Sequence, residues 1–338
     1  MALMAVAKMV GLVREQIIAN SFGTGTNYDA YQAALAAPEL LTTFLAYSAL
    51  GFALIPVYSA LITRREHENA NSLASSVINN ILLITICLSI IMALGAPLIV
   101  RSEWGIGPGF TPEQQALTAQ LLRVVLISAI LFSLSGILSS LLHSHQHFLM
   151  PALAPLAQDA GIIFGALVLA PRMDVMGLAW GAVLGATLHV LIQLPAVVAR
   201  GVRWRATLGW RDGRLWRVAT LMWPRILDLM MARMTIQWLT VNLTSRLGPG
   251  SVSAVGYAYK LMNMPQTIIG TAMGFVILPT LAEFAARNDV SAQRQTLSGS
   301  LRAIFALAVP AAVGLLTLGR PIIEVLFERG EFTADSTS

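Results

Sequence analysis

Nine apolar stretches, each long enough to cross a lipid bilayer as a helix, follow one another along this chain of 338 residues. A spanning helix needs roughly 20 mainly apolar residues. The stretches cover about residues 2–21, 29–62, 72–100, 116–142, 149–170, 174–199, 218–246, 252–284 and 298–326. Only 12% of the residues are charged, whereas a soluble domain carries about 25%. The sequence therefore predicts an all-α fold, a polytopic bundle of transmembrane helices.

Neither a β-barrel nor a catalytic or metal site is indicated by the residue pattern. Barrel strands alternate apolar and polar residues, whereas residues 81–91 form an apolar run without that alternation. His143, His145 and His147 alternate in a predicted loop, but this spacing is a weak signal for a metal, and we interpret it as a solvated loop instead. No Ser/His/Asp, paired-carboxylate or HExxH arrangement stands out, so we expect no catalytic residues and no metal.

The arginines indicate how the chain is oriented in the membrane. The loops after the second, sixth and eighth stretches hold ten arginines, at positions 64, 65, 200, 203, 205, 211, 214, 217, 287 and 294, and the opposite loops hold three, at 101, 172 and 329. Cytoplasmic loops carry an excess of Lys and Arg, so we expect a cytoplasmic N-terminus. The net charge of +5 follows from this topology, and no nucleic-acid partner is expected.

The sequence also contains an internal repeat. Four landmarks recur in the same order at an offset close to 224 residues: 23–25 and 248–250, 51–56 and 274–279, 94–99 and 318–323, 109–111 and 330–333. Six stretches precede the second copy, and an even number restores the starting orientation. The repeat is therefore parallel, as in some two-lobed transporters.

This repeat predicts two lobes around a central cavity. Residues 1–215 would form the N-terminal lobe with helices one to six, and residues 216–338 a partial C-terminal lobe with helices seven to nine. The second copy reaches only its third helix before Ser338, so by symmetry we expect about three further helices and interpret the chain as truncated. The first stretch begins almost at Met1, which we interpret as a clipped N-terminus.

Three basic side chains, Lys8, Arg14 and Lys260, fall within the apolar stretches. A charged side chain near the bilayer centre costs on the order of 2.5–3.5 kcal/mol, so such residues usually face a partner or a water-filled cavity. Lys8 and Arg14 lie about 120° off a common helix face, and both can border one broad cavity. The alternative, strongest for Lys8, is that the side chain extends to the membrane interface.

A second charged group, Arg225, Asp228 and Arg233, lies in the seventh stretch. Arg225 and Asp228 are three residues apart and can pair on one helix face. One interpretation is an ion pair near the cytoplasmic end, and the other is a substrate site. Arg233, if it lies deeper in the membrane, is a candidate for the cavity.

Longer motifs resemble those of the MurJ (MviN) lipid II flippase family. They occur in order along the whole chain, at residues 14–19 (Arg-Glu-Gln-Ile-Ile-Ala), 22–23, 28–31 (Tyr-Asp-Ala-Tyr), 38, 55–57, 257–262 (Tyr-Ala-Tyr-Lys-Leu-Met), 265 and 326–333 (Leu-Phe-Glu-Arg-Gly-Glu-Phe-Thr). The resemblance implies fourteen helices in two lobes around a V-shaped cavity, as in the multidrug/oligosaccharidyl-lipid/polysaccharide exporter superfamily. It implies a transporter rather than an enzyme, located in the bacterial inner membrane.

The resemblance also implies the substrate and the residues that bind it. The family carries lipid II, an undecaprenyl-pyrophosphate-linked disaccharide pentapeptide, from the cytoplasmic to the periplasmic leaflet by alternating access. Basic residues at the positions of Lys8, Arg14 and Lys260 contact the pyrophosphate, and Asp29 matches a family acidic residue near the periplasmic end of helix two. The partners would be lipid II or a related lipid-linked glycan, together with membrane lipids. No cofactor is implied, and sodium or the membrane potential is the candidate for coupling.

Two positions depart from the family pattern, and both are candidates for the cavity. Thr42 stands where the family has a further arginine, and Asn263 where it often has an acidic residue. Lysine also replaces arginine twice, and lysine cannot make the bidentate contact. A flippase or exporter of another lipid-linked oligosaccharide or small molecule is therefore an alternative. A non-transporting membrane scaffold is another, and an enzyme acting on polyprenyl phosphates would need a carboxylate cluster that the sequence does not display.

Overall fold

The computed structural model describes residues 2–45, 49–233, 237–287 and 289–337, and every regular element within them is helical. The elements are α1 (Ala2–Phe22), α2 (Thr26–Leu45), α3 (Ala49–Thr63), α4 (His67–Leu94), α5 (Ala96–Arg101), α6 (Pro112–Ser144), α7 (Leu149–Phe164), the π-helix η1 (Gly165–Leu169), α8 (Ala170–Met173), α9 (Val175–Leu191), α10 (Leu194–Ala199), α11 (Gly213–Arg233), α12 (Leu239–Thr244), α13 (Ser251–Ala286), α14 (Val290–Phe327) and α15 (Ala334–Thr337).

Each predicted apolar stretch coincides with one of these helices or with a run of successive ones. The second stretch, for example, corresponds to α2 and α3, and the fifth to α7, η1 and α8. Five helical segments of the described chain are long and apolar enough to cross a membrane by length and composition: His67–Leu94, Pro112–Ser144, Leu149–Met173, Val175–Ala199 and Val290–Phe327. The prediction of an all-α bundle is confirmed.

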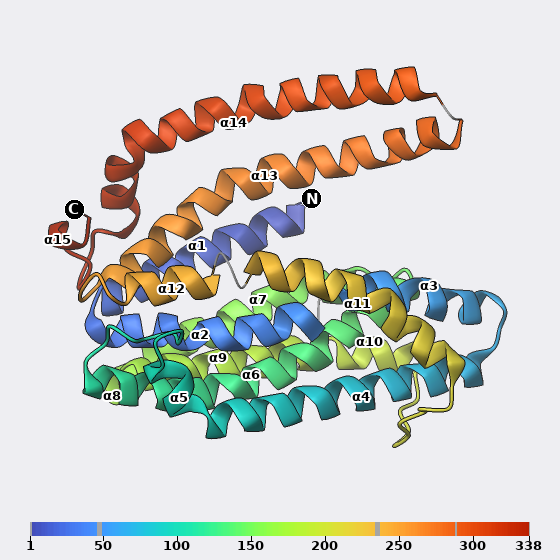
Figure 1. Cartoon of the computed structure of the whole chain (residues 1–338), viewed down its shortest axis with the longest axis horizontal. Helices are drawn as coiled ribbons and strands as arrows, with labels where there is room; N and C mark the ends of the chain where they lie inside the picture. The colour runs from blue at the N-terminus through green and yellow to red at the C-terminus, as the bar shows by residue number, and fades with distance from the viewer. Residues whose placement is uncertain (1, 46–48, 234–236, 288, 338) are drawn as a thin grey trace.

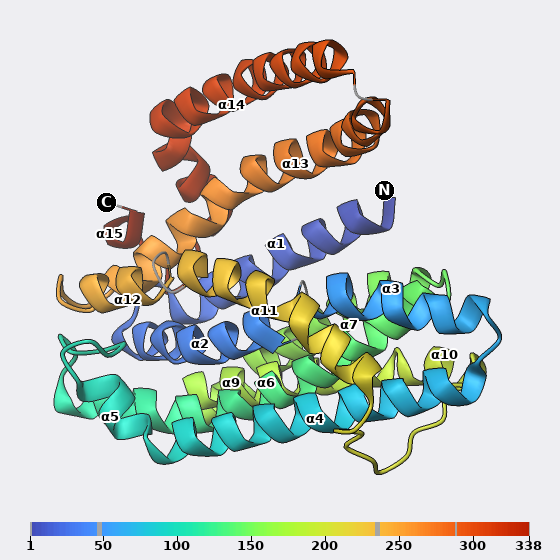
Figure 2. The same ribbon diagram turned by 45° about the vertical axis from the view of Figure 1, so that its right-hand side comes forward.

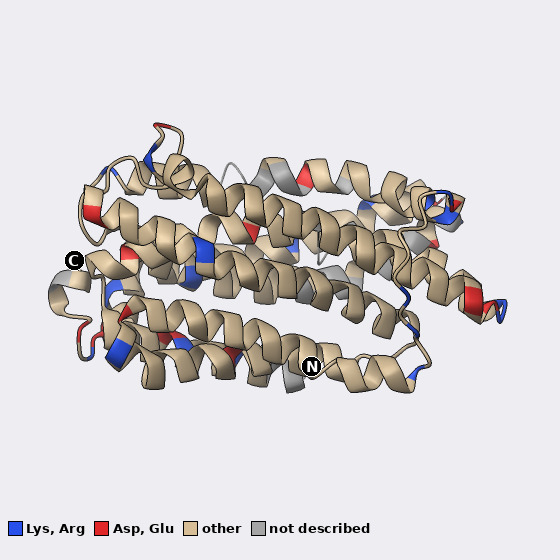
Figure 3. Ribbon diagram, turned by 90° about the horizontal axis from the view of Figure 1, so that it is seen from below, with Lys and Arg blue, Asp and Glu red and all other residues tan. Residues whose placement is uncertain are grey.

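We divide the helices in chain order into the first bundle (α1–α10) and the second unit (α11–α14), whose first helix, α11, packs on α2, α3 and α4 of the first bundle. The long helices of the first bundle run side by side along the longest axis of the molecule, while α13 and α14 form a long hairpin that leans away from it (Figures 1 and 2). The α3–α4, α10–α11 and α13–α14 connections all lie at one end, here called the basic end because it carries the predicted arginine-rich loops. Figure 3 shows long uncharged stretches of helix between the two ends.

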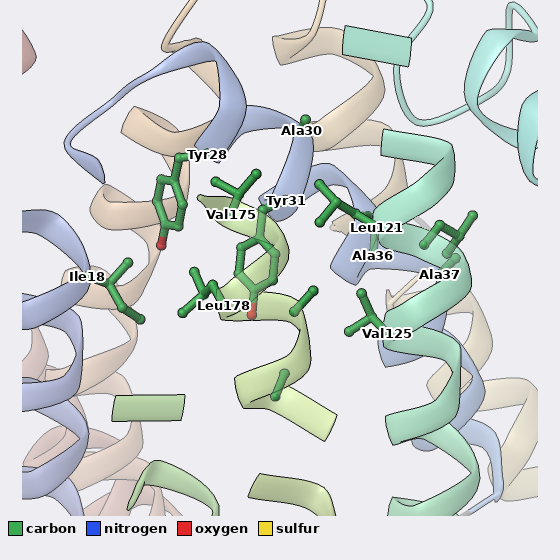
Figure 4. Close-up of a cluster of buried hydrophobic side chains, with 14 of the residues drawn as sticks. Ile18, Tyr28, Ala30, Tyr31, Ala36, Ala37, Leu121, Val125, Val175 and Leu178 are labelled. Carbon is green, nitrogen blue, oxygen red and sulfur yellow. The ribbon is translucent and has the colours of Figure 1, made fainter. Parts of the chain in front are cut away.

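A continuous apolar core joins the two groups at the end opposite the basic end. Tyr28 and Tyr31 of α2 are buried among residues of α1, α6 and α9 (Figure 4). Tyr257 of α13 reaches the same cluster, with its ring centroid 5.8 Å from that of Tyr28 and 5.2 Å from that of Phe327. Both ring pairs are tilted rather than stacked, and aromatic pairs at such distances add stability beyond the area that they bury.

Close helix contact through glycines holds α7 and η1 against α9. A Cβ atom on Gly161 would lie 2.3 Å from the Cα of Gly185, and one on Gly165 would lie 2.5 Å from the Cα of Gly181. Small residues spaced four apart let backbones approach closely in membranes, where burial from water gives little driving force between helices. These glycines therefore fix the wall that carries Asp159 toward α1.

The helix boundaries agree with the internal repeat, although the division into lobes stays a prediction. Residues 26–63, which hold α2 and α3, match α13 at the expected offset, and residues 67–101, which hold α4 and α5, match α14. The predicted boundary after residue 215 falls within the first turn of α11. The connection that precedes this helix, residues 200–212, is the better dividing point.

Candidate functional site

A cavity of about 1230 Å³ lies between the first bundle and the second unit. Its walls come from α1, α2 and α7 on one side and from α12 and α13 on the other, with Phe327 of α14 at its edge. A smaller cavity of about 470 Å³ adjoins it within the first bundle and shares Arg14, Glu15 and Lys260 with it. A site of this size between two helical units is a common setting for ligand binding in helix bundles.

Three basic side chains line the large cavity: Lys8 and Arg14 from α1 and Lys260 from α13. All three border one cavity, as expected from the sequence, and their contact with a substrate stays a prediction. Lys8 is exposed and makes no ion pair with any residue in the described part of the chain. Its position toward the basic end is compatible with both sequence interpretations, because it borders the cavity and is open to solvent.

Arg14 and Lys260 are joined by carboxylates in a chain of ion pairs. The Nζ atom of Lys260 lies 2.6 Å from Oε2 of Glu15, whose other oxygen pairs with Nη2 of Arg14. The Nη1 atom of Arg14 lies 2.6 Å from Oδ1 of Asp159 on α7. Three helices, α13, α1 and α7, are thus connected through four charged side chains. The Nε atom of Arg14 is buried and has no hydrogen-bond partner among the described residues.

Sequence reasoning missed the carboxylates of this site. Glu15, Asp159 and Glu39 line the same cavity as the three cations, so its charged lining is balanced. The signal was present, because Asp159 lies in an apolar stretch and Glu15 follows Arg14 directly. The rule that singled out the basic residues, the cost of a charge in the membrane, applies equally to acidic ones.

Asp29 lies outside the lining of both cavities and contacts the second unit instead. It is fully buried, and its carboxylate accepts hydrogen bonds from the backbone N–H of Gly250 (2.6 Å) and of Ser253 (2.8 Å) and from the Ser253 hydroxyl. These donors begin α13, and a carboxylate there satisfies free N–H groups and the helix dipole. Asp29 thus ties α2 to α13, and its predicted contact with substrate stays a prediction.

The remaining predicted positions differ in where they lie. Asn263 lines the large cavity and donates from Nδ2 to the carbonyl of Tyr259 at 2.9 Å. Thr42 lines the small cavity, with Oγ1 donating to the carbonyl of Glu39 at 3.0 Å. The side chains of Arg225 and Arg233 lie outside the described residues, so the predicted pair with Asp228 and the predicted cavity position of Arg233 stay predictions.

A buried polar cluster behind the small cavity was not predicted. His189 of α9 is 2% exposed, and its Nδ1 lies 2.5 Å from Oγ of Ser135 on α6. Gln193 donates to the same Ser135 oxygen at 2.5 Å and accepts from Ser139 at 2.8 Å. Buried polar groups of this kind fix helix register when they are fully paired. Across the described residues no group of three or more His, Cys, Asp or Glu side chains could hold a metal ion.

The amino-acid sequence matches a known protein family. A family model described as lipid II flippase MurJ matches residues 18–338. The lipid II flippase MurJ of Burkholderia cenocepacia is 28% identical to the chain, over 98% of the chain and 65% of that protein. The probable lipid II flippase MurJ of Vibrio cholerae is 25% identical over 98% of the chain and 65% of its own length. The chain thus spans slightly less than two-thirds of the curated relatives that it matches.

Solved structures resemble this fold along nearly the whole chain. A lipid II flippase MurJ in an inward closed conformation matches with a TM-score of 0.82 at 24% identity, covering 100% of this chain and 70% of that one. An inward-facing multidrug-resistance transporter of the MATE family matches with a TM-score of 0.78 at 15% identity, covering 98% and 74%. These similarities identify the fold as that of a helical transporter bundle that passes the membrane several times.

Proposed function

Because the chain belongs to the MurJ lipid II flippase family, we propose that it carries lipid II from the cytoplasmic to the periplasmic leaflet of the bacterial inner membrane. The observation that carries this proposal is the placement of Arg14 and Lys260, from two separate units, on one cavity of about 1230 Å³. A pyrophosphate group presents several anionic oxygens, and charge-assisted hydrogen bonds from guanidinium and ammonium groups are the strong contacts for it.

The carboxylates define how such a headgroup would bind. Glu15 forms ion pairs with both Arg14 and Lys260 in this structure. A bound pyrophosphate would therefore replace Glu15 as the partner of these two cations. The buried Nε of Arg14, which has no partner among the described residues, offers one further donor. The exposed Lys8 adds a mobile positive charge at the mouth of the cavity toward the basic end. Headgroup binding thereby weakens the direct link between α1 and α13.

Alternating access follows from the uneven closure of the cavity. At the end opposite the basic end, Asp29 holds the start of α13, and the backbone N–H of Glu331 donates to the carbonyl of Asn20 at 3.1 Å. Toward the basic end, α13 and α14 lean away from the first bundle (Figure 2). Transport then requires that the Asp29 contacts open while the basic end closes.

The orientation in the membrane is part of the same proposal. The connections that carry the ten arginines counted in the sequence lie at the basic end, and an excess of Lys and Arg favours the cytoplasmic side. The N-terminus would then lie in the cytoplasm, and the cavity would face it in this state. We include coupling to sodium or to the membrane potential in the proposal, with no cofactor.

A second candidate substrate is another lipid-linked pyrophosphate sugar. The balanced charge of the lining favours it, since the three carboxylates equal the three cations in number, and lysine lacks the bidentate geometry of arginine. The headgroup sugar is then decided by polar residues such as Gln158 and Gln237, which also line the cavity. The names of the relatives support a transporter rather than an enzyme or a scaffold.

Translocation of fluorescent lipid II by the protein expressed from its natural gene tests this proposal. In vesicles, Lys260→Ala should reduce the rate at least about tenfold, the effect of losing one charge-assisted contact of about 1.4 kcal/mol or more. The matched control is Arg287→Ala, which removes an exposed cation that pairs with Glu283 outside the cavity. Equal rates for the wild type and Lys260→Ala would contradict the proposal.

A further inference from the structure

The connection between α10 and α11, together with the first residues of α11, concentrates positive charge and tryptophan in a short length of chain. Residues 200–217, which we call the linker segment, contain six arginines and one aspartate, a formal charge of +5 that equals the net charge of the whole chain. They also contain Trp204, Trp210 and Trp216. Neither group is used in the proposed transport of a headgroup, because no residue of the linker segment lines either cavity described above.

Side chains of α4 hold the linker segment along the flank of that helix. Asn79 donates from Nδ2 to the carbonyls of Arg205 (2.9 Å) and Thr207 (2.8 Å), and Asn80 donates to the carbonyl of Leu208 at 2.6 Å. Ser75 contributes two more contacts nearer the start of α4, at the carbonyl of Arg203 and the N–H of Arg205. Figures 1 and 2 both show the segment running beside α4 near the basic end. It is therefore an ordered surface.

The three tryptophans point their indole N–H groups toward the protein and leave much of their apolar rings exposed. The indole N–H of Trp204 donates to Oδ1 of Asn79 at 2.8 Å, and that of Trp210 to Oδ1 of Asn80 at 2.7 Å. Trp216 donates to the carbonyl of Trp210 at 2.8 Å. The three residues are nevertheless 63%, 60% and 61% exposed. Since their only donors are satisfied by protein, the exposed part of each ring is apolar and needs no water.

The length and composition of α4 indicate that the linker segment lies near a membrane interface. The 28 residues of α4 make a helix of about 42 Å, whereas the hydrocarbon core is about 30 Å thick. Residues 81–100, in the later part of α4 and in α5, carry no charge. Twenty helical residues make about 30 Å, so Asn79 and Asn80 mark the level at which the polar part begins. Tryptophan is enriched at this level in membrane proteins.

The arginines of the linker segment are largely free of acidic partners. Arg203, Arg205, Arg211 and Arg217 are exposed. Asp212 is committed to Arg214, whose Nε and Nη2 lie 2.9 Å from its two oxygens. Glu68 comes only within 4.0 Å of Arg205, with both side chains well exposed, and such a pair is weak. The surface therefore presents a strong positive charge beside apolar rings.

We propose that the linker segment is a binding surface for anionic phospholipids of the adjacent leaflet. The tryptophan rings lie at the boundary between headgroups and acyl chains, and the exposed guanidinium groups contact the lipid phosphates. Positive segments next to a membrane attract anionic lipids over about one Debye length, and arginine contacts phosphate with two parallel hydrogen bonds. Because the segment connects the first bundle to the second unit, bound lipid also holds that connection at the membrane surface. This inference stands apart from the proposed substrate.

Quenching of tryptophan fluorescence by brominated lipids tests the inference on the purified protein from its natural gene. The protein is reconstituted in phosphatidylcholine vesicles that contain either brominated phosphatidylglycerol or brominated phosphatidylcholine at equal mole fraction. We expect the anionic lipid to quench more strongly, and we expect added salt to reduce the difference. Replacing Trp204, Trp210 and Trp216 by phenylalanine should remove most of the difference, which assigns the signal to the linker segment.

A charge variant and a matched control decide whether the arginines are responsible. Combined substitution of Arg203, Arg205, Arg211 and Arg217 by glutamine should lower the preference for phosphatidylglycerol at least about tenfold. The control replaces four arginines of the other loops at the basic end, at positions 64, 65, 287 and 294, and should keep the preference. Equal quenching by the two lipids in the wild type, or equal loss in the control, would overturn the proposal. An acidic protein partner instead of lipid would give that same absence of preference.

Discussion

Glu15 joins the two cations on which the site depends. It is 7% exposed, and its two oxygens face Lys260 on one side and Arg14 on the other. A buried ion pair gains little over apolar packing but becomes very costly when one partner is removed. Glu15 therefore stabilises the two cations in this structure, and in the proposed transport it competes with the headgroup for them. That competition allows release as well as binding.

The candidate residues show what a residue-level prediction can and cannot reach. Lys8, Arg14 and Lys260 were found because a charge within an apolar stretch is rare enough to need an explanation. The link from Asp159 to Arg14 joins residues 145 positions apart in the chain, and no local pattern specifies that contact. The role of Asp29 was missed for the same reason, since its partners Gly250 and Ser253 lie in another helix.

One titratable residue at the basic end should make stability depend on pH. Burial, followed by the charges of Arg200 and His67, lowers the pKa of His145 below its usual value of 6.5. Its Nε2 lies 3.3 Å from the hydroxyl of Tyr58. The unfolded chain therefore binds a proton at His145 before the folded one does, so the stability contributed by neutral His145 is present above pH 6.5 and is lost as the pH falls below it.

The melting temperature of the purified protein, followed from neutral to mildly acidic pH, checks this prediction. The wild type should lose more stability than His145→Gln, which keeps a polar side chain but cannot be protonated. His67→Gln removes one of the charges that lower the pKa of His145, so its curve should fall between those of the wild type and His145→Gln. Parallel curves for the wild type and His145→Gln would contradict the assignment.

At the scale of elements, glycine spacing decides which helices can touch. Residues 161 and 165, and residues 177, 181 and 185, are glycines spaced four apart. In the structure these two sets face one another between α7–η1 and α9. This pairing was readable in the sequence, because small residues at this spacing mark helix contacts in membranes. The π-helix η1 could not be predicted from the sequence, since apolar periodicity does not distinguish a π-helix from an α-helix.

Adding one methyl group at this contact should destabilise the fold. A Cβ atom on Gly181 would lie 2.6 Å from the Cα of Gly165, so Gly181→Ala should lower stability by roughly 1–3 kcal/mol through overpacking. The control is Gly51→Ala, where the nearest atom to the new Cβ is 3.8 Å away. Thermal unfolding of the two purified variants distinguishes them, and equal melting temperatures would contradict the contact.

For the whole molecule, three acidic residues of the first bundle contact residues that lie between α11 and α14 or within those helices. Glu15 pairs with Lys260, Asp29 caps α13, and Glu39 accepts from Gln237. The order and approximate extent of the apolar helices followed from the apolar stretches, since each span must pair its own backbone groups within the segment. The tilt of α13 and α14 away from the first bundle could not be predicted from the sequence, because it depends on contacts at one end only.

Alternating access predicts that locking the end opposite the basic end stops transport. A Cβ atom on Gly250 would lie 3.5 Å from the Cβ of Thr24, within the range of a disulfide, and 2.8 Å from the Thr24 carbonyl oxygen, so the backbone must shift slightly to admit it. The variant Thr24→Cys/Gly250→Cys, made with Cys87→Ala, should form this bond under oxidation at a backbone cost of about 1–2 kcal/mol. Lipid II translocation should cease on oxidation and return on reduction. Transport that continues with the bond formed would refute this account of the motion.

Binding of lipid II to the purified protein in nanodiscs, measured for the wild type, Lys260→Ala and Glu15→Gln, tests the central claim most directly. If the pyrophosphate replaces Glu15 at Arg14 and Lys260, Lys260→Ala should bind about tenfold more weakly and Glu15→Gln roughly tenfold more tightly than the wild type. Unchanged affinity in both variants, or weaker binding in both, would contradict the claim that headgroup and carboxylate compete for the same two cations.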